Sequence, residues 1–268
     1  VYGGGSPTGI TFYENGALGP KWEGLLLSCE AALNSIFGYK PVPKGGTFEL
    51  ERFVFLTSNP RKEYDGADFS GRKEIKHGED SKISPTFFRP SDVTVGPDGA
   101  IYFADWFDPR IGASSHLDES FSGTIYRVAP KGFKPKIPKV DLTNINGQIM
   151  ALRSPAINTR YLGFRSLKSR GEKASNFVFK QLDDANKWIA ARAVWLLPYM
   201  GDQGLDACIK MLEDENSDQR VVAYRSLRRY GHDMIPHARR MCKDKSPQVR
   251  REIALSLRDL PAEKTLSL

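Results

Sequence analysis

The sequence predicts an all-β part followed by an α-solenoid. In the first half of the chain, short β-rich runs alternate with turns that contain Gly, Pro or Asn. From Arg160 onwards one pattern returns every thirty residues, and it is marked by Gly171, Gly201 and Gly231. A fixed period of this length indicates that one unit is stacked several times, because a single unit cannot bury its own apolar face.

The composition is that of an ordinary folded protein, with 268 residues of which 40% are hydrophobic and 26% are charged. Such a chain is long enough for two domains with their own cores. We expect no membrane span, because no apolar run approaches the roughly 18 to 20 residues that a bilayer crossing requires. The chain starts Val-Tyr-Gly-Gly-Gly without an initiator Met, so we expect a fragment of a longer protein.

The first half is expected to form a meander of roughly seven strands. The runs with strand composition lie at residues 9–13, 25–29, 48–56, 92–95, 100–104 and 124–128. Two segments interrupt them: residues 59–87 are highly charged, and residues 108–122 are rich in Ser, Gly and Asp. We expect both to be long loops on one face, where binding sites usually lie.

A change of composition separates the two halves. Residues 130–142 read PKGFKPKIPKVDL, and this density of Pro and Lys favours a linker. The predicted organisation is therefore a β domain at residues 1–130, a Lys/Pro-rich linker at 131–145 and a helical domain at 146–268.

Each repeat of the second half is expected to start with an amphipathic helix. These first helices are predicted at residues 160–171, 190–201, 220–231 and 250–261. A left-handed Gly should end each of the first three. An Asp follows the second helix of a repeat and should accept backbone N–H bonds from the next helix start, at Asp184, Asp214 and Asp244. Cys242 takes the repeat position of Leu182 and Leu212, which predicts a core residue.

Residues 154–260 resemble HEAT-like repeats of the short bilin-lyase type, because they share the paired helices, the thirty-residue period, an internal Arg and a terminal Gly. The resemblance implies a scaffold. The whole net charge of +7 belongs to this half, since residues 1–140 are balanced. A basic helical surface attracts nucleic acid, anionic lipid or an acidic protein. The alternative is that Arg and Lys merely extend from amphipathic helices into water.

Two stretches of the first half resemble the propellers of soluble glucose/sorbosone dehydrogenases. They are SPTGITFYENGALGPKWEGLLLSCE, at residues 6–30, and FRPSDVTVGPDGAIYFADWFDP, at 88–109, with GTIYRV at 123–128. The similarity is closer to the planctomycete-type "membrane-bound dehydrogenase" proteins, in which HEAT-like repeats and a cytochrome c domain follow a propeller. The resemblance implies that residues 1–130 are about two C-terminal blades of an incomplete β-propeller, in a bacterial protein of the periplasm or cell surface.

The resemblance also implies a cofactor, pyrroloquinoline quinone, which that family holds with two arginines and a lysine. Arg89 matches the first arginine, whereas Ser91 stands at the second position and Ala31 roughly at that of the lysine. The family's catalytic histidine belongs to an earlier blade. Arg89 is therefore the implied cofactor residue, and catalysis by this segment alone is not expected.

The residues at the end of strand 100–104 allow a second kind of site. Asp105 and Asp108 flank the aromatic Trp106, and carboxylates at a loop entrance suit Ca²⁺ or a sugar hydroxyl. The alternative is that Asp105 caps a turn while Trp106 packs between blades. Asp92 precedes them on the neighbouring strand, and His116, close to acidic residues, is the best candidate among the four histidines.

Three functions follow from these observations. The first is a fragment of a sugar-dehydrogenase-like protein that is redox-linked when complete. Its cofactor would be Ca²⁺ or the quinone, and its partners would be carbohydrate, the missing blades and a cytochrome c domain. The segment itself has no haem motif. The second is a non-enzymatic interaction scaffold. The third and least favoured is a solenoid that binds nucleic acid. The predicted interaction surface comprises Arg228, Arg229, Arg239 and Arg240.

Overall fold

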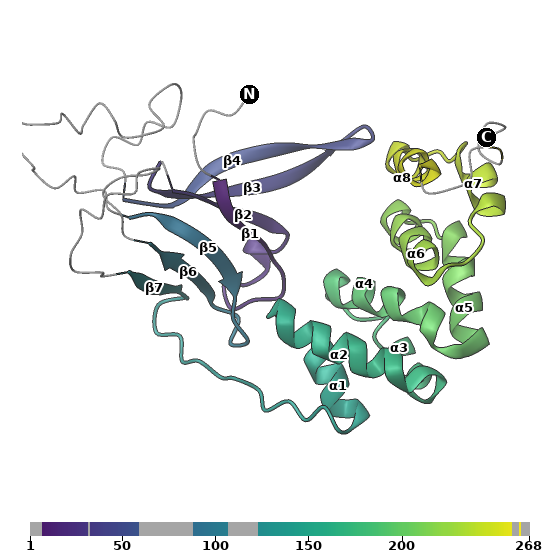
Figure 1. Cartoon of the computed structure of the whole chain (residues 1–268), viewed down its shortest axis with the longest axis horizontal. Helices are drawn as coiled ribbons and strands as arrows, with labels where there is room; N and C mark the ends of the chain where they lie inside the picture. The colour runs from purple at the N-terminus through teal and green to yellow at the C-terminus, as the bar shows by residue number, and fades with distance from the viewer. Residues whose placement is uncertain (1–6, 32, 59–87, 107–122, 259–262, 264–268) are drawn as a thin grey trace, which may run out of the picture. The chain divides into compact units, whose positions relative to one another are not determined.

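The computed structural model describes residues 7–31, 33–58, 88–106, 123–258 and 263 (Figure 1). The chain divides into two compact units. A β unit comprises Val1–Pro41 and Leu50–Pro138, and a helical unit comprises Val42–Glu49 and Lys139–Leu268. Within the described ranges no helix combines the length and the apolar character needed to cross a membrane.

The first sheet is a four-stranded antiparallel meander in the order β1-β2-β3-β4. Its strands are β1 (Pro7–Tyr13), β2 (Leu25–Glu30), β3 (Ser35–Lys44) and β4 (Thr47–Thr57), with a short 3₁₀ turn at Pro20–Trp22. The predicted strands at 9–13, 25–29 and 48–56 are confirmed. Their alternation places Leu25, Leu27 and Cys29 in the core.

Strand β3 was not among the predicted runs, because Gly38, Pro41 and Pro43 lower its strand propensity. The pairing explains how the prolines are tolerated. Strand β3 pairs with β2 only from Ser35 to Tyr39. Pro41 and Pro43 lie beyond this paired part, so neither proline has to donate a backbone N–H to β2.

The second sheet has three antiparallel strands in the order β5-β6-β7. They are β5 (Pro90–Val95), β6 (Ile101–Asp105) and β7 (Thr124–Val128), as the sequence predicts. The turn before β6 has Gly99 at φ +82°, the conformation that the Pro-Asp-Gly sequence requires. Ile101 and Phe103 are buried, whereas Tyr102 is half-buried on the opposite face.

The two sheets share one hydrophobic core, to which Tyr13, Leu27 and Ile36 contribute from the first and Val93 and Ile101 from the second. Hydrogen bonds join their ends. The Thr8 hydroxyl donates to the Pro90 carbonyl at 2.9 Å, and the Ala17 N–H donates to the Gly99 carbonyl at 2.8 Å. The described strands thus form two open antiparallel sheets, and they do not close into a barrel or a propeller.

The helical unit begins with α1 (Ile145–Leu152) and continues as stacked pairs. The first helices are α2 (Ile157–Arg170), α4 (Lys187–Leu196), α6 (Ser217–Tyr230) and α8 (Pro247–Leu257). The second helices are α3 (Ser175–Phe179), α5 (Gly201–Lys210) and α7 (Ile235–Met241). Short 3₁₀ turns lie at Gly171–Ala174, Leu197–Tyr199 and Met211–Glu213. One core runs through the stack, from Leu152 to Ile253.

The recurring aspartates have the predicted role. Asp184, Asp214 and Asp244 each accept the backbone N–H two residues later through Oδ1, at 2.9, 2.8 and 2.7 Å. These bonds fix the backbone just before the next helix. Asn186 and Asn216 then cap α4 and α6 with their side chains. The thirty-residue period therefore repeats a capped loop as well as an apolar stripe.

Two details of the helical prediction were wrong. Helix α4 ends at Leu196 rather than at Gly201, because Pro198 has no N–H to donate to the Val194 carbonyl, which accepts the Leu197 N–H and, at 3.0 Å, the Ser226 hydroxyl. Cys242 lies only partly buried at the side of the core. Gly231, in contrast, ends α6 in the predicted left-handed conformation, at φ +93° and ψ +20°.

Candidate functional site

Arg89 and Asp105 meet at the end of the second sheet. The Arg89 N–H donates to Asp105 Oδ1 at 2.7 Å, and the Trp106 N–H donates to the Arg89 carbonyl at 2.9 Å. Arg89 and Asp105 are both buried, with exposed fractions of 3% and 5%. Asp105 thus holds the backbone of the neighbouring strand just before β5 begins, across 16 positions of sequence.

The guanidinium of Arg89 reaches the first sheet. Its Nη1 donates to the Ala31 carbonyl at 3.0 Å, across 58 positions of sequence. Nearby, the Asn34 side chain donates to the Phe88 carbonyl at 2.7 Å. The structure therefore brings together Arg89 and Ala31, the two positions that the dehydrogenase resemblance compares with cofactor contacts, and it does so through a direct bond between the sheets.

The other candidates in the β unit are not gathered around Arg89. Asp92 is exposed, and its Oδ1 accepts the N–H of the adjacent Val93 at 2.8 Å. Trp106 is 68% exposed. Asp108 and His116 lie outside the described residues. Burial, followed by the charge of Asp92, raises the pKa of the Cys29 thiol to about 12, so this cysteine is a core residue and not a nucleophile.

A polar cluster at the β5–β6 turn was not singled out in the sequence. The carboxylate of Asp98 accepts the Tyr102 hydroxyl at 3.0 Å and Arg127 Nε at 3.1 Å, while the Ala100 N–H donates to it at 3.1 Å. All of its oxygens are occupied within the β unit, which indicates a structural role in fixing the turn.

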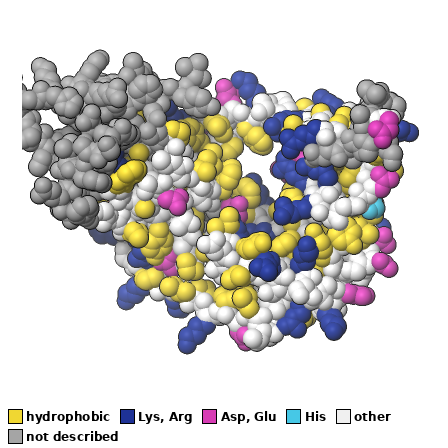
Figure 2. Space-filling model, viewed as in Figure 1, with side chains coloured by type: hydrophobic (Ala, Val, Ile, Leu, Met, Phe, Trp, Pro, Cys, Tyr) yellow, Lys and Arg dark blue, Asp and Glu magenta, His cyan; other side chains and the backbone are white. Residues whose placement is uncertain are grey.

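Two of the four arginines of the predicted interaction surface, Arg228 and Arg240, form ion pairs with glutamates of the helical unit. Arg228 Nη1 lies 3.5 Å from Glu252, on α8. Arg240 Nη1 lies 2.6 Å from Glu213. Arg229 and Arg239 are exposed near the ends of α6 and α7. Figure 2 shows Lys and Arg side chains interspersed with hydrophobic ones over this unit.

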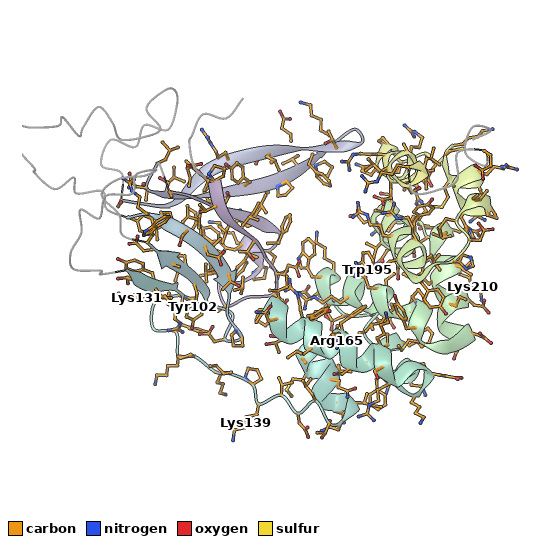
Figure 3. The ribbon with its side chains drawn as sticks, in the orientation of Figure 1. Tyr102, Lys131, Lys139, Arg165, Trp195 and Lys210 are labelled. Carbon is orange, nitrogen blue, oxygen red and sulfur yellow. The ribbon has the colours of Figure 1, made fainter. Side chains whose placement is uncertain are left out.

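A more continuous surface lies along the first helices. We define the first-helix face by side chains at equivalent repeat positions that reach solvent: Tyr161, Leu162, Arg165, Trp195, Arg225, Arg251 and Leu255. Figure 3 shows Arg165 and Trp195 on the neighbouring helices α2 and α4, with Lys210 on α5 at the opposite edge of the unit. The signal was present in the sequence, as the thirty-residue spacing of Arg165, Trp195, Arg225 and Leu255.

Internal contacts hold several of these side chains in place. The Arg165 guanidinium lies 5.8 Å from the centre of the Tyr161 ring. Arg225 donates to Glu252 Oε2 from Nε and Nη2, at 2.8 and 2.6 Å. The aromatic and cationic groups are thus presented on rigid helices. This arrangement contains no nucleophile–base pair and can act as a binding surface.

Comparisons with known proteins agree with the helical architecture. Residues 175–258 match the sequence model of the family described as HEAT repeats. No curated protein matches the chain. The matched segment runs from the start of α3 through α8. This part of the chain is therefore assigned to HEAT-like repeats, a class that suits protein partners.

Proposed function

We propose that this protein is an interaction scaffold that binds a protein partner along the first-helix face. The observation that carries the proposal is that one repeat position is occupied in every repeat by a large side chain that reaches solvent. These side chains, thirty residues apart, are Arg165, Trp195, Arg225 and Leu255. Stacked repeats present equivalent positions side by side, so these side chains form one row that crosses the helices. A partner lying across the stack would contact all of them.

The composition of the face supports binding. Tyr161 is 57% exposed, Leu162 46% and Leu255 42%. Tyr161 and Leu162 are adjacent on α2, and exposed apolar side chains that form a contiguous patch mark interaction sites. Trp, Tyr and Arg are also the residues that supply most of the binding energy in protein interfaces.

The charge of the first helices supports an acidic partner. Helices α2 and α4 contain no acidic residue. Helix α6 contains only Asp218 and α8 only Glu252, which is 4% exposed and paired with arginines. Each first helix has at least two Lys or Arg. Carboxylates of a partner would therefore meet the cations Arg165 and Arg251 of the face, with little acidic charge on the first helices to oppose them.

Charge reversal tests this proposal. Arg165→Glu on the exposed side of α2 should abolish capture of the partner, whereas Lys210→Glu on α5 makes the same change away from the face and should leave capture unchanged. Partners captured by the wild type are identified, purified and titrated against both variants at low and high salt. Equal binding by the two variants would remove the first-helix face from consideration.

We also propose a second candidate function for the β unit, that of a carbohydrate- or cofactor-binding part of a propeller in a longer, redox-linked protein. It is supported by two antiparallel meander sheets around a shared core. The bond from Arg89 to Ala31 counts against a quinone contact by Arg89. A titration of the full-length protein with pyrroloquinoline quinone and Ca²⁺, and separately with sugars, tests it; no saturable binding would end this proposal.

A further inference from the structure

His232 and His237 form a pair at the corner between α6 and α7. Their Nε2 atoms lie 3.2 Å apart and share a hydrogen bond, in which the ring that carries the proton on Nε2 donates to the other ring. The ring centres are separated by 5.3 Å, with an angle of 35° between the ring planes. Both side chains are half-buried. The two imidazoles therefore direct the same type of nitrogen toward one small volume.

The backbone fixes both histidines. At the end of α6, the Gly231 N–H donates to the Arg228 carbonyl and the His232 N–H to the Leu227 carbonyl, both at 3.1 Å. These two bonds and the left-handed Gly231 form a Schellman motif, which sets the direction of the chain at His232. His237 lies in the first turn of α7, whose start is held by the Ile235 N–H bond to Asp233 Oδ1 at 3.1 Å.

We propose that this histidine pair binds a divalent transition-metal ion such as Zn²⁺ or Cu²⁺, with the two Nε2 atoms as ligands and water in the remaining positions. Histidine nitrogens bind Zn²⁺ at about 2.0–2.1 Å, so two of them on a tetrahedral ion lie about 3.3 Å apart. The separation of 3.2 Å between the two atoms fits this requirement, and a bound ion would take the place of the proton that the two rings share.

The surroundings favour this class of metal over a hard cation. Imidazole suits Zn²⁺ and Cu²⁺, whereas Ca²⁺ and Mg²⁺ require oxygen ligands.

The site is a two-residue site. Within the described ranges no group of three or more His, Cys, Asp or Glu side chains is placed to hold a metal. Two protein ligands leave positions on the ion open to water. We therefore expect binding that is weaker than in a closed structural zinc site and easily reversed by chelators.

Titration calorimetry of the complete chain with Zn²⁺ and with Cu²⁺, after removal of bound metal by a chelator, tests the proposal. One site is expected. His232→Ala and His237→Ala should each weaken binding by about tenfold or more, since even the loss of a residue that merely orients a ligand has effects of this size. The matched control replaces the other two histidines, His77 and His116, and should bind like the wild type.

Electron paramagnetic resonance of the Cu²⁺ complex gives a readout that reports ligation directly. The wild type should show coupling to two imidazole nitrogens, and each single variant should lose one of them while its thermal melting curve remains cooperative. The absence of saturable binding, binding that persists when both histidines of the pair are replaced, or loss of binding in the His77/His116 control would each overturn the proposal.

Discussion

Arg220 and Asp244 join two consecutive repeats through a two-point ion pair. Arg220 Nε donates to Asp244 Oδ2 at 2.9 Å, and Nη2 donates to Oδ1 at 2.7 Å. The side chains are only 5% and 13% exposed. Arg220 Nη1 also donates to the carbonyls of Asp214 and Glu215, so one guanidinium ties together two interhelical loops.

Arg220→Ala should lower the free energy of unfolding by about 3–5 kcal/mol, because it leaves the largely buried carboxylate of Asp244 without its counter-charge. Urea denaturation followed by circular dichroism measures the change. Arg250→Ala is the matched control: Arg250 occupies the same repeat position but is exposed and donates to the Asp244 and Lys245 carbonyls, so about 1 kcal/mol is expected. Equal losses in both variants would contradict the assigned role of the ion pair.

The same ion pair predicts acid sensitivity. Burial raises the pKa of Asp244, but hydrogen bonds from Arg220 and Ser246 and the Arg220 charge outweigh it and hold the pKa below its usual value. As the pH falls, the Asp244 carboxyl of the unfolded chain, with a pKa of about 3.9, is protonated before that of the folded protein. The stabilisation is therefore complete above that pH and is lost as the pH falls through the lower folded value. Urea midpoints measured from neutral to acid pH should fall more steeply for the wild type than for Arg220→Met.

Gly163→Ala should destabilise the contact between α1 and α2. A Cβ at this position would lie 2.4 Å from the Leu152 nitrogen and 2.7 Å from the Gln148 carbonyl oxygen. Backbone atoms cannot turn aside as a side chain does, so we expect a loss of about 1–3 kcal/mol, although Ala favours a helix over Gly by about 1 kcal/mol. Ser169→Ala, on the exposed side of α2, should have little effect in the same thermal unfolding assay.

Cysteine labelling should single out Cys242. Burial raises the pKa of Cys29 and that of Cys208 to about 12, and Cys242 is the half-buried thiol of the three. Because the thiolate is the reactive form, limiting iodoacetamide should modify Cys242 first in the folded protein, as mass spectrometry would detect. In Cys242→Ser, appreciable labelling should require denaturant, and rapid labelling of Cys29 without denaturant would show that the β core is not closed.

Arg89→Met should reduce the stability of the β unit by about 1.5–3 kcal/mol, the usual contribution of a hydrogen bond to a charged group. The bonds lost include that from Nη1 to the Ala31 carbonyl. A residue reserved for a cofactor would instead leave the stability of the unliganded protein unchanged. Denaturation monitored by tryptophan fluorescence distinguishes the two roles.

The sequence predicted the local part of this structure. The thirty-residue period located the first helices, and the recurring aspartates their caps, since both depend on neighbouring residues. Strand β3 was missed because Gly38, Pro41 and Pro43 favour a loop until the pairing with β2 is known. Pro198, in contrast, was visible in the sequence, and its missing N–H is a sufficient reason for the early end of α4.

The candidate sites depended more on long-range contacts. The resemblance pointed to Arg89 and Ala31, but a bond across 58 positions cannot be seen in a local pattern. His232 and His237 are five residues apart, a spacing that does not face one side of a helix. Only the left-handed turn at Gly231 brings their rings together.

The arginine position of Arg220 is not filled in every repeat. Arg160 and Arg250 are its equivalents, but the second repeat has Ala190 instead. Around the first junction Arg153 bonds to the Asp184 carboxylate, and Arg192 donates to the Leu152 carbonyl at 3.0 Å. The solenoid is thus tied by arginines at its start and near its end, with an interruption between them.

Asp214 lies at that interruption. Among the described residues, its carboxylate accepts the Asn216 N–H but has no arginine side chain against it, unlike those of Asp184 and Asp244. The stack is therefore mechanically uneven. Arg220 still donates to the Asp214 and Glu215 carbonyls, so this loop is bonded to the repeat that follows it but has no arginine pair, at its carboxylate, with the repeat before it.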